Sequence, residues 1–124
     1  PVARLFKEQK PVLVVGSAWP DDMDVLIPFI NQFSQPLKVI IAPHEIQDHD
    51  IEKWRRELIK SSIRFSQTQD SAFNLFTLAE FDVLFIDNVG MLSSLYQYGE
   101  FAYIGGAFKQ GLHNILESAT FGMP

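Results

Sequence analysis

Short apolar runs alternate with amphipathic segments along the whole of this 124-residue chain. The runs are rich in Val, Ile and Phe and end at Gly, Pro or Asp, which is typical of strands that are buried on both faces. They predict strands at residues 12–15, 37–42, 62–65, 82–86 and 101–104, of which the third is the least apolar. Helical periodicity predicts helices at residues 22–33, 48–60, 91–98 and 114–120, and a helical tail at residues 4–9.

This regular alternation of strand and helix, without repeats or low-complexity segments, favours one α/β fold class. We expect a Rossmann-like parallel sheet with helices on both faces. The domain is predicted to span residues 11–124, and residues 1–10 are predicted to form a linker. Composition agrees with one ordinary domain, since 47% of the residues are hydrophobic and 20% are charged.

Charge and cysteine content exclude some classes of partner and site. The formal net charge is −5 and the basic residues are dispersed, so no nucleic-acid partner is expected. The chain has no cysteine, which excludes disulfides and thiolate metal sites. His49 lies between Asp48 and Asp50, but no further ligand follows at a diagnostic spacing, and a helix cap is the expected role.

The closing segment carries the strongest chemical signal. Gly105 and Gly106 end the last apolar run, and the lack of side chains there allows backbone amides to approach a ligand. His113, Asn114 and Glu117 follow at the start of an apolar-periodic segment, with Asn114 as a good N-cap and Glu117 three residues later. Free amides and the helix dipole at such a terminus favour an anion such as a nucleotide phosphate.

The same segment resembles the nucleotide-sugar-binding segment of the 3-deoxy-D-manno-octulosonic acid (Kdo) transferases. The resemblance lies in a Gly-Gly pair followed by Gly-x-His-Asn-x-Leu-Glu-x-Ala-x-x-Gly-x-Pro, and it extends over about residues 11–124. It implies an inverting transfer of Kdo from CMP-Kdo to a lipid A precursor in Gram-negative lipopolysaccharide biosynthesis. It also implies a two-domain GT-B fold, in which this chain is part of the C-terminal donor domain.

Within the resemblance, most matching residues follow the predicted strands, where ligands collect in open parallel sheets. The residues expected to bind CMP-Kdo are Gly16, Ser17, Pro43, His44, Asp87, Gly90, Met91, Gly105, Gly106, His113, Asn114 and Glu117. Glu117 is expected to accept from ribose hydroxyls, and Asn114 to face the phosphate or Kdo. The chain departs from the family pattern at Met91, Ala107 and Leu112, which replace a Glu, a Ser and a Gly.

Several of these residues also have a structural interpretation, which the sequence leaves open. His44 and Asp87 also fit polar turn or cap residues, and Asp21 and Asp22 are expected to cap the following helix. Trp19 could stack on a base or sugar, or pack under its own turn or against another domain.

The resemblance also sets expectations for the complete protein. The catalytic base would lie in an N-terminal acceptor domain, so no catalytic residue is assigned here, and no metal or other cofactor is expected. The chain is expected to be soluble, inactive alone and incomplete after Pro124. The complete protein would act at the cytoplasmic face of the inner membrane, with any membrane association through the missing part.

Three other functions use a similar sheet. A dinucleotide-binding dehydrogenase is disfavoured, because Gly16 is not followed by the rest of a Gly-x-Gly-x-x-Gly motif. The donor domain of another GT-B enzyme, a UDP-sugar transferase or an epimerase, is the strongest alternative. A receiver-like regulatory domain is weaker, because the acidic pair Asp21 and Asp22 lies late in its loop.

Overall fold

The computed structural model describes residues 2–89 and 96–106, except for the side chain of Tyr98. Several predictions therefore lie outside the described residues. These are the helix at 114–120, most of the helix at 91–98, and the site residues Gly90, Met91, His113, Asn114 and Glu117.

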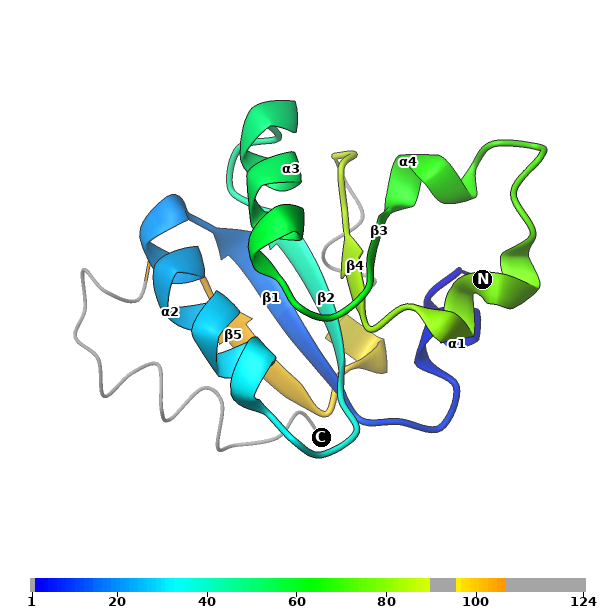
Figure 1. Ribbon diagram of the computed structural model, residues 1–124, viewed down its shortest axis with the longest axis horizontal. Coiled ribbons are helices and arrows are strands. Elements are labelled where there is room, and N and C mark those ends of the chain that lie inside the picture. The colour runs from blue at the N-terminus through cyan, green and yellow to red at the C-terminus, as the bar shows by residue number, and fades with distance from the viewer. Residues whose placement is uncertain (1, 90–95, 107–124) are drawn as a thin grey trace.

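A parallel sheet forms the centre of the described part of the chain (Figure 1). Its five strands lie in the order β3-β4-β2-β1-β5. They are β1 (Val12–Ala18), β2 (Lys38–Pro43), β3 (Ser62–Arg64), β4 (Val83–Phe85) and β5 (Phe101–Ile104). In the middle of the sheet, Val14 of β1 pairs with Ile40 of β2 on one side and Ala102 of β5 on the other. All pairings are parallel, so the predicted fold class is confirmed.

Helices cover both faces of this sheet. On one face lie α2 (Pro20–Gln32) and α3 (Asp48–Glu57), which bury Met23, Ile30 and Trp54 against the strands (Figure 1). On the other face lie α1 (Val2–Lys7), α4 (Phe65–Thr68) and the 3-10 helices η1 (Leu75–Glu80) and η2 (Tyr96–Tyr98). Successive strand residues alternate between the two cores, which explains why the strands read as continuous apolar runs.

The ends of several elements differ from their predicted positions. Strand β1 continues three residues beyond the prediction, so Gly16 and Ser17 belong to the strand itself. Helix α3 ends at Glu57 because the Asn31 side chain of α2 bonds to the backbone there. The Asn31 NH₂ group donates to Glu57 O, and the Asn31 amide oxygen accepts from Ile59 N. The sequence did not predict α4 or η1, and η1 begins where the Asn74 side chain accepts from Phe76 N.

Lys38 is a charged side chain inside this fold, with no exposed surface. Its ammonium group donates to Ala79 O at 2.7 Å and to Phe81 O, and it lies 4.9 Å from the centre of the Phe6 ring. Burial lowers the pKa of Lys38, and the nearby Lys10 lowers it further. These contacts fasten η1 and α1 to the first residue of β2, at the amino end of the strand.

Among the helices of the described residues, none is long and apolar enough to cross a bilayer.

Candidate functional site

A pocket of about 300 Å³ opens at the carboxyl ends of β1, β2 and β4. Its lining consists of Ser17, Ala42, Pro43, His44, Ile46, Ile86, Asn88 and Val89. Three predicted site residues from two strand ends, Ser17 of β1 and Pro43 and His44 at the end of β2, therefore line one pocket. Ligands in open parallel sheets bind at this edge, so the pocket is the candidate site.

Strand β1 enters the site through a bulge. The register with β2 shifts between Val15 and Ala18, and Ser17 has a φ of 52°, a left-handed conformation that is uncommon for serine. Such conformations cost of order 1–3 kcal/mol and cluster at functional sites. The bulge brings Ser17 into the pocket lining and places its backbone carbonyl against the turn that follows β5.

That turn is formed by Gly105 and Gly106, and its glycines serve close packing. A Cβ on Gly105 would lie 1.7 Å from Ser17 O, and Gly105 N donates to Gly16 O at 2.6 Å. Gly106 has a φ of 84°, and its N–H donates to Asp22 Oδ2 at 3.0 Å. The amides of both glycines thus bond within the protein, which differs from the predicted role of amides that approach a ligand.

Trp19 and His44 form the stacked ring pair at the edge of the site. Their ring centroids are 3.8 Å apart and their planes differ by 16°. His44 N also donates to Ala18 O at 2.7 Å, which ties the end of β2 to the end of β1. The Trp19 ring passes close to Gly106 as well, 3.6 Å from where a Cβ would stand. Trp19 therefore packs within the site and joins the turns after β1, β2 and β5.

Asp87 follows β4, and its carboxylate is bound inside the protein. It accepts from Arg64 Nε and Ser66 N, both at 2.8 Å, and from the Ser66 hydroxyl. Only 2% of the side chain is exposed. Burial by itself would raise the pKa of Asp87, but the hydrogen bonds from Ser66 and Arg64 outweigh it and lower that pKa. This agrees with the turn interpretation of Asp87, while its neighbours Ile86 and Asn88 line the pocket.

The lowered pKa of Asp87 predicts an acid-sensitive contribution to stability. The folded pKa lies below the ordinary value of 3.8, so this contribution is complete above that pH and is lost as the pH falls through the folded pKa. Asp87→Asn should therefore flatten the dependence of Tm on pH between about 5 and 2. Thermal unfolding at several pH values measures this, with exposed Asp24→Asn as the control. An unchanged pH dependence in Asp87→Asn would refute the assignment.

Arg64 connects Asp87 to α3, since it also forms ion pairs with Asp48 and Glu52. Asp48 begins α3, as expected for an acidic residue in a first helical turn. Among the described residues, no group of histidine and acidic side chains is arranged to hold a metal ion.

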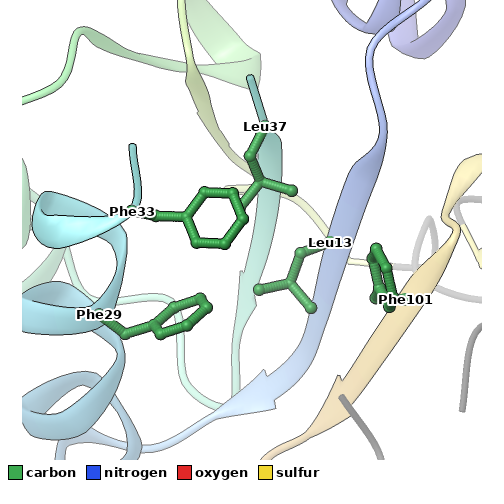
Figure 2. A pocket seen from close by; sticks show the side chains of 5 residues that line it. All are labelled: Leu13, Phe29, Phe33, Leu37 and Phe101. Carbon is green, nitrogen blue, oxygen red and sulfur yellow. The ribbon is translucent and has the colours of Figure 1, made fainter. Parts of the chain in front are cut away.

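A second hollow of about 150 Å³, lined by apolar residues, lies at the opposite end of the sheet. Figure 2 shows Phe29 of α2 and Phe33, the residue after this helix, facing Leu13 of β1, with Phe101 of β5 and Leu37 nearby. Leu13, Leu37 and Phe101 lie at or next to the amino ends of β1, β2 and β5, away from the edge where parallel sheets bind ligands.

Sequence reasoning missed the second role of Asp22. The residue does cap α2, because its carboxylate accepts from Trp19 N at 2.8 Å, as expected. It is also fully buried, and it accepts from the hydroxyl of Tyr103 and from Gly106 N. The one available signal was Tyr103 in an apolar strand, because a buried tyrosine hydroxyl needs a partner.

The open parallel sheet, with helices on both faces and a candidate pocket at the strand ends, defines a Rossmann-like α/β domain. Comparisons with known proteins narrow this class. No family model matches the chain. Three curated proteins that do match are all 3-deoxy-D-manno-octulosonic acid transferases. The protein of Chlamydophila psittaci is 31% identical over 115 residues, which cover 91% of this chain and 25% of that protein. That of Rickettsia prowazekii is 33% identical over 127 residues (94% and 25%), and that of Aquifex aeolicus 30% over 118 residues (90% and 30%).

A solved structure shares the fold, the C-terminal CMP-Kdo binding domain of WaaA from Acinetobacter baumannii. The TM-score is 0.62 at 21% identity, over 85% of this chain and 55% of that one. The chain is thus homologous to a segment of the Kdo transferases, and the resemblance inferred from its sequence is confirmed. It spans about a quarter of the length of the first curated relatives.

Proposed function

We propose that this chain supplies the donor-binding half of an inverting Kdo transferase and binds CMP-Kdo in the pocket at the strand ends. The observation that carries the proposal is the convergence of Ser17, Pro43 and His44 on one pocket. These residues were selected from a resemblance to Kdo transferases, and proteins of that name match more than 90% of this chain.

In the proposed reaction, the donor-binding half stabilises the departing nucleotide. In an inverting transfer, a base takes the proton of the acceptor hydroxyl while negative charge develops on the phosphate of CMP. His44, Ser17 and Asn88 are polar residues of the pocket lining whose side chains can hydrogen-bond that phosphate, and we assign this role to His44 and Ser17. A pocket of about 300 Å³ is at the small end for a nucleotide, so we assign further contacts to His113, Asn114 and Glu117.

The rest of the reaction is assigned to parts of the protein outside this chain. An acceptor domain would bind the lipid A precursor and supply the base, at the cytoplasmic face of the inner membrane. Residues 1–10 are proposed to lead to that domain, with α1 packed on the sheet through buried Phe6. No metal is required by the proposal, because CMP-Kdo carries one phosphate.

Titration of the protein in its natural length with CMP and UDP tests the proposal. CMP is expected to bind more tightly than UDP. Ser17→Ala and His44→Ala should each weaken CMP binding about three- to tenfold, the usual range for one hydrogen bond. Asn114→Ala and Glu117→Ala should also weaken it, while Lys53→Ala on the exposed side of α3 should not. Preference for UDP would indicate the donor domain of another GT-B enzyme, such as a UDP-sugar transferase or an epimerase. The absence of nucleotide binding would refute the proposal.

A further inference from the structure

Asp22 is a buried carboxylate with unusual partners. Its residue has no exposed surface, and among the described residues it forms no ion pair with a lysine or arginine. Burying a charge is costly unless hydrogen bonds compensate for it. Both of its oxygens accept: Oδ1 from the Tyr103 hydroxyl at 2.7 Å, and Oδ2 from Trp19 N at 2.8 Å and Gly106 N at 3.0 Å.

Only one of these bonds is needed to cap α2. The bond from Trp19 N belongs to the helix terminus, whereas Tyr103 and Gly106 lie 81 and 84 residues away along the chain. Tyr103 is itself buried, and burial together with its bond to Asp22 raises the pKa of its phenol further above neutral pH, where the hydroxyl is a donor. The carboxylate thus joins the turn after β1 to the turn after β5.

Trp19 connects Asp22 and the two turns that it joins to the pocket. The Trp19 backbone bonds to Asp22, and its ring packs beside Gly106 and stacks on His44, which lines the pocket. On the other side, Gly105 bonds to Gly16 and packs against the carbonyl of Ser17, a second lining residue. Displacement of Asp22 would therefore loosen three strand ends together.

We propose that Asp22, supported by Tyr103, is a positioning residue that locks the Gly105–Gly106 turn against Trp19 and so fixes the shape of the donor pocket. The inference rests on the proposed function for the identity of the ligand. The positioning role itself concerns the hydrogen bonds that Asp22 accepts from the backbone amides of Gly106 and Trp19. The strength of these bonds can be measured without any ligand.

The test compares Asp22→Asn with Asp21→Asn, which removes the same charge from an exposed position one residue earlier. Asp22→Asn keeps the shape but replaces the charged acceptor with a neutral one. Even with its NH₂ group toward the Tyr103 hydroxyl, which can accept, its oxygen holds the amides of Trp19 and Gly106 more weakly than a carboxylate does. Hydrogen exchange at the Gly106 amide, without ligand, should be about tenfold faster in Asp22→Asn. Affinity for CMP should fall about tenfold, and Asp21→Asn should change neither quantity.

Tyr103→Phe is a second variant, which removes only the hydroxyl donor to Asp22. It should produce changes in the same direction but smaller, about threefold. Lys38→Ala, at the amino end of β2, serves as a variant that is destabilised away from the pocket, and it should leave CMP affinity unchanged. Normal Gly106 exchange in both Asp22→Asn and Tyr103→Phe would overturn the inference. So would a loss of CMP affinity in Lys38→Ala as large as in Asp22→Asn. If the wild-type protein binds no CMP, the proposed function fails, while the exchange measurement still decides the lock.

Discussion

Gly105→Ala is expected to lower the free energy of unfolding by about 3 kcal/mol, at the upper end for overpacking, and to abolish CMP binding. The new Cβ would lie 1.7 Å from Ser17 O and 2.5 Å from Ser17 C. Both are backbone atoms, so no side-chain rotation relieves the clash, and β5 must move away from the bulge in β1. The bond from Gly105 N to Gly16 O, now 2.6 Å, would break in that movement.

Urea unfolding and a CMP titration measure the two effects, with Gly99→Ala as the matched change. A Cβ on Gly99 would meet Val14 Cγ2 at 2.7 Å and Phe101 O at 3.1 Å, so its closest contact is a side-chain methyl group. We expect Gly99→Ala to cost about 1 kcal/mol and to spare CMP binding, because it lies before β5 and away from the pocket. Wild-type stability in Gly105→Ala would show that the turn and the bulge are not in contact as described.

The sheet could be predicted from sequence because its strands are buried on both faces. Each strand then reads as an apolar run, and the alternation with helices implies parallel pairing. The ends were less predictable, because they depend on partners from other elements. Strand β1 continues to Ala18, whose carbonyl accepts from the N–H of His44, the residue that follows β2. Nothing within residues 12–18 signals that contact.

Residues 65–80 show the same limit for helices. This segment has no long helical period, so the sequence predicted only the end of a strand there. A tertiary contact holds the end of η1 in place: the Lys38 ammonium donates to the carbonyls of Ala79 and Phe81, about 40 residues later in the chain. The residues within 65–80 cannot indicate such a contact, because its donor, Lys38, lies in strand β2, far away in the sequence.

The sheet topology made the position of the candidate site predictable, but it did not predict the roles of the polar residues around it. Parallel strands end at one edge, so Ser17, Pro43 and His44 could be expected to meet, and they do. The roles of Asp22 and Asp87 depend on Tyr103 and Arg64, which are distant in sequence. A polar residue after a strand therefore fits a ligand contact and an internal bond equally well until the fold shows its partner.

Arg64→Met is expected to lower the free energy of unfolding by about 3 kcal/mol, because removing one partner of a buried ion pair leaves the other charge uncompensated. Asp87 is that partner, with 2% of its side chain exposed, and only the bonds from Ser66 would remain. The pair with Asp48 adds little, because the Asp48 side chain is 83% exposed. Methionine retains most of the apolar stem, so the loss reports the charge.

The pH dependence of this loss distinguishes the ion pair from general damage. Arg64 helps to lower the pKa of Asp87, so its contribution is complete above pH 3.8 and disappears as Asp87 becomes protonated at lower pH. The difference in stability between wild type and Arg64→Met should therefore be largest at neutral pH and shrink toward pH 2–3, as measured by urea unfolding at each pH. Arg56→Met, an exposed change on α3, should cost little at any pH. A difference that is the same at all pH values would mean that Arg64 stabilises the fold by packing alone.

The ion pair should also support the candidate site, because Asn88 and Val89 follow Asp87 and line the pocket. CMP affinity should therefore fall in Arg64→Met and stay normal in Arg56→Met.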